Sequence, residues 1–204
     1  IQRVFVFRTM ADIDSDGADR LPGGVRHHRL PMPDPAAADD LRNIIQSTEP
    51  DQIKALFGNG RAAAMMVDHA AVLVRDRREA YAEFLTELAR PESLPALFHC
   101  SAGKDRAGWA GTLVLLALGV DEDQVVEQYL LSNQNLDGIR KRLQSGWDSS
   151  WAEYLRPFLE VRREYIESSF AAVREDWGSF DRYLAEGLAI SDRQRARLRE
   201  SLLE

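Results

Sequence analysis

Cysteine is almost absent from this chain, because Cys100 is the single one among 204 residues. A lone cysteine excludes an intramolecular disulfide and any reaction that cycles one within the chain. The thiol is therefore either part of the core or a nucleophile. We expect a reducing, cytoplasmic compartment. Because the chain opens at Ile1 within an apolar run, we also expect the natural N-terminus to lie upstream, which keeps secretion open as an alternative.

Long hydrophobic runs and an excess of positive charge are also lacking. The longest apolar stretch, residues 109–120, is well short of the roughly 20 residues needed to cross a bilayer. The net charge of -7 argues against a general binder of nucleic acid or anionic membranes. We therefore expect no nucleic-acid partner and no integral membrane segment. An anionic substrate would have to be bound by a local basic pocket.

The chain has enough apolar material for one core, since 45% of its 204 residues are hydrophobic. Three short runs of β-formers predict strands, namely residues 4–7, 25–30 and 96–99. Residues 61–90 have a helical composition with two possible breaks, and this segment ends before Pro91. Helix is predicted to dominate the second half. Alternating strands and helices favour an α/β domain.

Several local signals place the later helices. The spacings Asp121 to Gln124 and Ser191 to Gln194 are those of a capping box, and Ser179 follows a glycine as another predicted helix start. Apolar and aromatic side chains recur at about helical spacing, and we interpret them as core or lid packing. These residues are Trp151, Tyr154, Leu155, Phe158, Ile166 and Phe170.

The segment around the cysteine carries the chemical signal. Residues 99–108, HCSAGKDRAG, lie between a predicted strand and an apolar helix, where open α/β folds bind ligands. Backbone N–H groups that enter a helix converge on one spot, and the helix dipole adds positive charge there. Gly103 lets the backbone curl, and Arg106 offers a planar fork for two phosphate oxygens. The same field predicts a lowered pKa for Cys100, which would make it a nucleophile at neutral pH.

A nucleotide-binding P-loop is excluded for this segment. That pattern needs glycine at position 98 and serine or threonine at position 105, where the chain has Phe98 and Asp105. Arsenate reduction needs further cysteines for a thiol relay, and sulfur transfer would leave the Lys-Asp-Arg sequence without a purpose.

The same residues resemble a known family. A His-Cys pair with arginine six residues after the cysteine is the signature of the protein-tyrosine phosphatase superfamily, in the HCxAGKDRxG form of its bacterial branch. Residues 119–133, GVDEDQVVEQYLLSN, are similar to the helix after the loop, and residues 177–188, WGSFDRYLAEGL, resemble a C-terminal signature. Upstream, residues 4–12 resemble a strand that ends in Asp-Leu-Arg, with Arg8 matching the arginine and Val6 replacing the aspartate.

The resemblance covers most of the chain and implies a single phosphatase domain over residues 1–204. Compared with the family, the segment of roughly fifty residues before this point is missing. The implied fold is α/β and three-layered, with a short, mostly parallel central sheet, helices on both sides and a helical C-terminal extension. The implied substrate is a phosphorylated protein, at tyrosine or also at serine and threonine, or a phospholipid headgroup. No metal or other cofactor is implied.

The resemblance also implies roles for individual residues. Cys100 attacks phosphorus, and Arg106 holds phosphate oxygens together with the rest of the loop, namely Ser101, Ala102, Gly103, Lys104 and Asp105. The leaving oxygen needs a proton, which the family takes from an aspartate on a separate loop. Asp34 matches that position, in the proline-rich stretch 31–40. Asp105 is a second candidate for the acid or else an orienting group, and His99 is expected to orient the loop by hydrogen bonding.

One departure from the family bears on turnover. The family carries threonine or serine after the arginine, and this chain has Ala107. The missing hydroxyl predicts a slow second step in which the cysteinyl phosphate accumulates. The alternative is a pseudophosphatase, a phosphate-recognition module in which Ala107 and Val6 mark lost catalysis.

Overall fold

The structure is a computed structural model that describes residues 1–33, 50–136 and 151–203. Two of the sequence predictions concern residues outside these ranges. The first concerns Asp34 and the stretch to residue 40. The second concerns part of the segment between residues 135 and 170, whose aromatic side chains we interpret as core or lid packing.

The centre of the fold is a three-stranded sheet in which all strands run parallel. Its strands are β1 (Arg3–Val6), β2 (Arg26–Arg29) and β3 (Ala96–His99), in the order β2-β1-β3. In the register, Phe5 of β1 lies opposite His28 of β2 and Phe98 of β3. All four residues of β1 are buried, as expected of a central strand. The predicted strands are therefore confirmed to within a residue at each end, and their carboxyl ends meet at one edge.

An aromatic cluster joins one face of the sheet to helix α5 (Arg78–Leu88). Phe84 of α5 is buried against Phe5, Phe7 and Phe98, with ring centroids 5.1, 5.4 and 5.2 Å away. Edge-to-face pairs of this kind are worth about 0.5–1.5 kcal/mol each beyond the area they bury. This face therefore supports the strand ends on which the loop around Cys100 depends.

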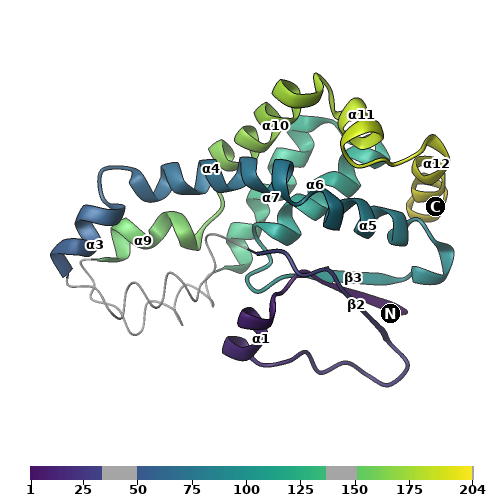
Figure 1. Cartoon of the computed structure of the whole chain (residues 1–204), viewed down its shortest axis with the longest axis horizontal. Coiled ribbons are helices and arrows are strands. Elements are labelled where there is room, and N and C mark those ends of the chain that lie inside the picture. Colours follow the sequence, from purple (N-terminus) through teal and green to yellow (C-terminus); the bar gives the residue numbers. More distant parts are fainter. Residues whose placement is uncertain (34–49, 137–150, 204) are drawn as a thin grey trace.

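The remaining helices build outward from that face. Helix α4 (Arg61–Asp76) precedes α5, with the break at Arg77, and the short 3₁₀ helix η1 (Pro91–Ser93) follows α5. Helix α6 (Arg106–Leu118) comes directly after the cysteine loop, and α7 (Glu122–Asn135) follows it. Helix α10 (Arg163–Trp177) lies along α4, where Ser169 Oγ donates to the Ala70 carbonyl at 3.1 Å. Figure 1 shows these helices on one side of the sheet and α1 (Met10–Asp16) on the other.

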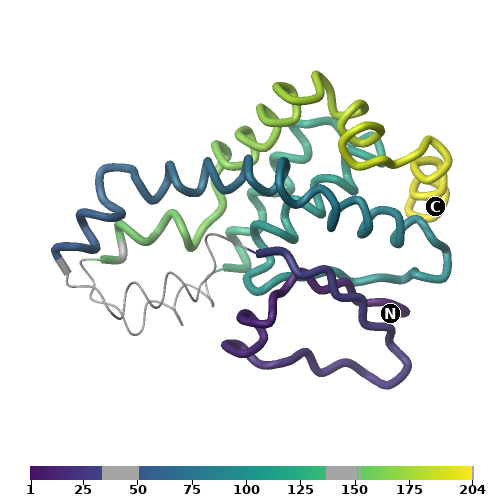
Figure 2. Tube along the Cα trace, viewed as in Figure 1, coloured from purple at the N-terminus to yellow at the C-terminus, as the bar shows by residue number. Residues whose placement is uncertain are grey.

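A second apolar cluster lies at the far end of α4 and extends away from the sheet, as the trace in Figure 2 shows. It is formed by α4 with α3 (Pro50–Phe57), α9 (Ala152–Leu155) and the 3₁₀ helix η3 (Arg156–Leu159). Phe57 and Phe158 meet edge to face at 5.3 Å. Leu155 and Phe158 are buried here, while Ile166 and Phe170 are buried in the main core. The interpretation of the aromatic stripe as packing is confirmed.

The C-terminal part is helical, as predicted. It contains α11 (Phe180–Arg182), a π-helical turn η4 (Tyr183–Gly187) and α12 (Asp192–Leu202). Ser191 and Gln194 form a complete capping box, and Ser179 and Asp121 cap α11 and α7. Within the described ranges, no helix is both long and apolar enough to cross a membrane.

Candidate active site

The cysteine loop begins where β3 ends and runs from Cys100 to the first residue of α6, Arg106. Gly103 has a φ of +76°, in the left-handed region that side chains other than hydrogen rarely adopt. This turn brings the Gly103 N–H to 3.3 Å from the Cys100 sulfur, to which it donates. The loop is therefore curled around the sulfur. Ser101 and Gly103 are exposed and Ala102 is half-buried, so this part of the loop faces solvent.

His99 supports the loop from its start. Its Nδ1 lies 2.9 Å from the carbonyl oxygen of Cys100. A carbonyl can only accept, so Nδ1 carries the hydrogen and donates it. This contact fits the expected orienting role of His99.

Arg106 is almost completely buried at the carboxyl edge of the sheet. Its Nη1 donates to the carboxylate of Asp12 at 2.7 Å and to the backbone carbonyls of Phe7 and Met32, both at 3.2 Å. Its Nη2 contacts Asp12 Oδ1 and Ser101 Oγ, both at 3.4 Å. The guanidinium is thus anchored by Nη1, and Nη2 is the end nearer to the loop.

Asp12 is the residue that sequence reasoning missed. It is the buried residue of α1, and its carboxylate also accepts from the N–H and hydroxyl of Thr9 and from Ser101 Oγ. Burial alone would raise the pKa of Asp12, but the hydrogen bonds from Arg106 and Thr9 outweigh it and hold this pKa below its ordinary value. The Thr9-x-x-Asp12 spacing, which forms a capping box at the start of α1, is the signal that could have pointed to it.

Lys104 and Asp105 form an ion pair within the loop. Lys104 is buried, and its Nζ lies 2.6 Å from Asp105 Oδ2. Asp105 also lines a cavity of about 20 Å³ together with Tyr129 and Tyr165, room for about one water molecule. Burial raises the pKa of Tyr129, and the charge of Asp105 adds to the rise. Asp105 thus lies on the side of the loop that faces α7 and α10, and the positive charge of Lys104 is balanced inside the loop.

The predicted lowering of the Cys100 pKa is wrong for this arrangement. Cys100 is buried, and burial raises the pKa of its thiol above the ordinary value, with the carboxylate of Asp105 adding to the rise. Arg106 and the N–H groups of Ala107 and Gly103 act in the opposite direction without prevailing. The reason is that burial of the thiol disfavours the thiolate by more than Arg106 and the two N–H groups favour it.

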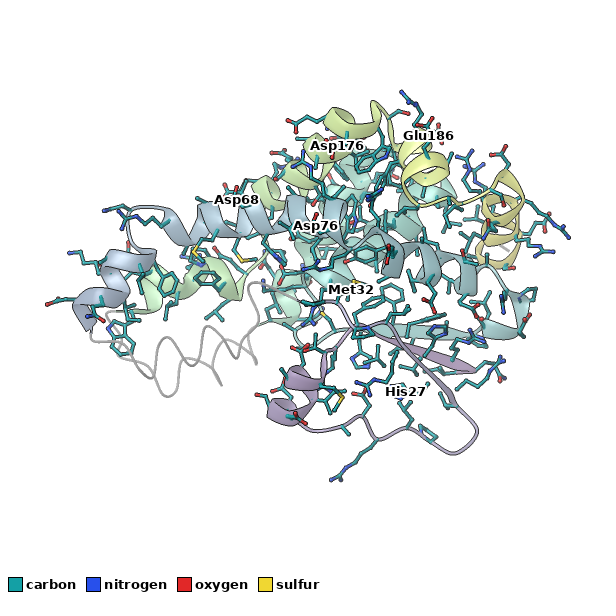
Figure 3. The ribbon with its side chains drawn as sticks, viewed as in Figure 1. His27, Met32, Asp68, Asp76, Asp176 and Glu186 are labelled. Atoms are coloured by element: carbon teal, nitrogen blue, oxygen red, sulfur yellow. The ribbon has the colours of Figure 1, made fainter. Side chains whose placement is uncertain are left out.

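Asp34 lies outside the described residues, but the chain that leads to it is well placed. Met32 is buried, and its N–H donates to the carbonyl of Phe7 at 3.1 Å while its own carbonyl accepts from Arg106. Figure 3 shows Met32 where the chain passes from the sheet toward the helices. One residue later, the Pro33 carbonyl accepts from Arg77 at 3.1 Å. The chain therefore reaches position 33 beside the anchored guanidinium.

Comparison with known proteins decides the family. A sequence profile described as the tyrosine phosphatase family matches residues 1–204. This chain belongs to that family. A protein of Cupriavidus necator assigned by name to the tyrosine-protein phosphatases is 39% identical over 118 residues, which cover 55% of this chain and 41% of that protein. The triple specificity protein phosphatase PtpB of Mycobacterium tuberculosis is 29% identical over 221 residues, which cover 96% of this chain and 80% of that protein.

The match confirms the predicted superfamily and the phosphatase enzyme class. The α/β fold, with its small parallel sheet and its many helices, is the one that the resemblance implied. The chain spans less than half the length of the first relative and most of the second.

Proposed function

We propose that this phosphatase hydrolyses phosphate monoesters of tyrosine, and also of serine and threonine or of phosphoinositides, through a cysteinyl phosphate on Cys100. The observation that carries the proposal is the arrangement of one loop. The loop holds the Cys100 sulfur, which accepts hydrogen bonds from backbone N–H groups. Six residues later it holds Arg106, which is anchored at the same edge of the sheet. The sulfur can attack the phosphorus of a phosphate dianion, and the arginine with the N–H groups can bind its oxygens.

In the first step, the Cys100 thiolate attacks phosphorus, a sulfur–phosphorus bond forms and the bond to the leaving oxygen breaks. Arg106 and the loop N–H groups hold the other phosphate oxygens, where negative charge is densest. A carboxylic acid gives its proton to the leaving oxygen. In the second step, water attacks phosphorus, its proton returns to that carboxylate, and the sulfur leaves as a thiolate.

Asp34 is the better candidate for the acid. Asp105 accepts from the Lys104 ammonium at 2.6 Å and faces the cavity beside Tyr129, which suits an orienting group. Asp34 follows directly on a segment tied to Arg106 through Met32.

Leaving-group dependence tests this assignment. Asp34→Asn should slow hydrolysis of phenyl phosphate about 100-fold or more and that of 2,4-dinitrophenyl phosphate little, because only phenolate needs the proton. Asp105→Asn should affect both esters equally, and the reverse pattern would make Asp105 the acid.

The breadth of the proposed specificity rests on the Mycobacterium tuberculosis relative, whose name records triple specificity. We also infer a reducing compartment, because the reaction depends on Cys100 remaining a free thiol. Phosphopeptides carrying each of the three phosphorylated residues, and water-soluble phosphoinositides, should be compared by phosphate release. Release from phosphotyrosine peptides alone would narrow the proposal to that ester.

Rapid-quench hydrolysis of p-nitrophenyl phosphate at about pH 6 tests the covalent step. We expect a burst of nitrophenol stoichiometric with enzyme, followed by slow turnover, and neither in Cys100→Ser. When the substrate carries a radiolabelled phosphoryl group, the label should remain on the acid-quenched wild-type protein and be absent from the variant. Absence of both burst and turnover in a protein that still binds inorganic phosphate would overturn the proposal in favour of a recognition module.

A further inference from the structure

A second arginine, Arg8, lies near the carboxyl edge of the sheet, and its hydrogen bonds go to residues outside the cysteine loop. Arg8, two residues beyond β1, is buried, with 5% of its surface exposed. Its Nη2 donates to the backbone carbonyl of Asp12 at 2.7 Å, and its Nη1 donates to Asp19 Oδ1 at 3.1 Å. Arg8 therefore connects α1 to the chain that follows α1.

Asp19 also lies close to the sheet. Its Oδ2 lies 3.6 Å from His27 Nε2 of β2 and 3.5 Å from His99 Nε2 of β3, and its side chain is only 14% exposed. Through Arg8 it also reaches the end of β1. One carboxylate thus pairs with Arg8 just beyond β1 and lies near side chains of β2 and β3. Figure 3 shows His27 on the same side of the sheet as α1.

Helix α1 needs this support because apolar packing supplies little. It has seven residues, and Asp12 is the one buried residue among them. Most of the others are exposed, including Met10, Asp14 and Asp16. A helix this short is not stable by itself in water. Its position, and with it the position of the Asp12 carboxylate, depends on the Thr9 cap and on the contacts of Arg8.

We propose that Asp19 and Arg8 are positioning residues that set the orientation of Arg106 through Asp12. Asp19 fixes Arg8, Arg8 fixes the backbone of Asp12, and the Asp12 carboxylate fixes Nη1 of Arg106. Binding of phosphate by a guanidinium requires a defined plane and direction, so a shift of α1 changes how Nη2 meets the anion. The inference rests on the proposed function in one respect, the use of Arg106 to bind phosphate.

Binding of inorganic phosphate tests this relay without any turnover. Affinity should be measured by calorimetry well below the unfolding midpoint, in wild type, Asp19→Asn and Arg8→Lys. Each variant should bind phosphate about tenfold more weakly, the size of effect that loss of a supporting residue has at other sites. Lysine keeps the positive charge, but its single ammonium cannot reproduce the two hydrogen bonds that Arg8 donates from separate nitrogens to the Asp12 carbonyl and to Asp19. Asp16→Asn removes the same charge from an exposed position of α1 and should bind as wild type.

A double-mutant cycle separates the relay from a general loss of charge. If Asp19 acts through Asp12, the double variant Asp12→Asn with Asp19→Asn should bind phosphate as weakly as Asp12→Asn alone, to within about twofold. Multiplicative effects of the two changes would overturn the inference, and so would wild-type affinity in a folded Asp19→Asn or Arg8→Lys. Circular dichroism checks folding. Should Asp19→Asn be unfolded, Arg8→Lys carries the same cycle.

The outcomes also separate this inference from the proposed function. Wild-type protein that binds phosphate but shows no burst would contradict the covalent mechanism and leave the relay fully testable. Normal turnover with unchanged phosphate affinity in both variants would contradict the relay alone.

Discussion

At the scale of single residues, the site is governed by how one positive charge is divided. Arg106 lies between the Cys100 sulfur, whose thiolate it stabilises, and the Asp12 carboxylate, which it pairs with at 2.7 Å. The pairing helps to hold the pKa of Asp12 below its ordinary value, whereas burial raises the pKa of Cys100 despite the charge of Arg106. Because the Asp12 carboxylate partly neutralises Arg106, we expect it to affect the reactivity of the sulfur.

Asp12→Asn should lower the pKa of Cys100. Removing the anion leaves the charge of Arg106 uncompensated, which favours the thiolate over the thiol. The rate of iodoacetamide alkylation, followed against pH, should reach half its maximum at a lower pH in the variant than in wild type. Asp16→Asn, which changes the charge of an exposed position, should leave the midpoint unchanged. An equal or higher midpoint in Asp12→Asn would show that Asp12 does not attenuate the field of Arg106.

The same carboxylate makes stability depend on acid. The pKa of Asp12 is depressed on folding, so its contribution to the free energy of unfolding is complete above the unfolded value of about 3.9 and is lost as the pH falls through the folded value. The difference in unfolding free energy between wild type and Asp12→Asn should therefore shrink below about pH 4. Urea titrations at about pH 6 and at about pH 3 measure it. A constant difference would contradict the assignment of the lowered pKa to the folded state.

Ala107→Thr should speed turnover. Ala107 offers the sulfur a backbone N–H but no hydroxyl, and a hydrogen bond to a charged sulfur is worth about 1.5–3 kcal/mol, or roughly 10 to 150-fold in the rate of dephosphorylation. The steady-state rate after the burst should rise while the burst amplitude falls. Cys100→Ser, which cannot form the cysteinyl phosphate, serves as the control. Unchanged turnover in Ala107→Thr would remove the explanation for a slow second step.

At the scale of elements, the sequence predicted best where a signal is local. The strands follow from short runs of β-formers, the caps at Asp121 and Ser191 from spacings of three residues, and the cap at Ser179 from its place after a glycine. The Thr9-x-x-Asp12 spacing could mark Asp12 as part of a helix cap, but the roles of Asp12 and Asp19 at the site could not be assigned from local spacing. Their partners Arg106 and His99 lie far along the chain and meet them only after the parallel sheet has formed. The Cys100 pKa was mispredicted for the same reason, since the burial that raises it is a tertiary effect.

The capping box of α12 gives an element-scale test. Ser191→Ala should destabilise the protein by about 1 kcal/mol, because the side chain of Ser191 accepts the N–H of Gln194 at the start of the helix. Thermal unfolding monitored by circular dichroism measures the loss. Ser201→Ala, in the last turn of the same helix, should change stability by less than about 0.5 kcal/mol. Equal losses of unfolding free energy in the two variants would show that the cap does not stabilise the protein.

At the scale of the whole molecule, the fold has two apolar centres with different tasks. The main core joins the sheet to α5 and α6 and so holds the cysteine loop, whereas the second cluster around Phe57 and Phe158 joins α3, α9 and η3 to the end of α4. The predicted aromatic stripe contributes to both. The sequence indicated that these side chains are buried, but their division between two centres depends on how α4 and α10 lie together.

This division predicts unequal local stability. Phe158→Ala should open the second cluster, at a cost of about 3–5 kcal/mol, while the sheet stays closed. Amide hydrogen exchange should quicken in α3 and η3 and remain slow in β1 and α6. Phe84→Ala, in the main core, should instead quicken exchange in β1. Faster exchange throughout the molecule in Phe158→Ala would show that the two centres unfold as one.

The backbone carbonyls of Phe7 and Met32 have a consequence for variation. Two of the acceptors that hold Arg106 belong to the main chain at the ends of neighbouring strands. A substitution at position 7 or 32 that keeps the strand in place cannot delete these oxygens, while a single exchange at position 12 removes the carboxylate. Apolar replacements of similar size at Phe7 and Met32 should therefore keep Arg106 anchored, whereas replacements at Asp12 should not, and phosphate affinity across the variants measures the difference. Two of the contacts that anchor Arg106 therefore depend on the backbone conformation, whereas its ion pair depends on the identity of the side chain at position 12.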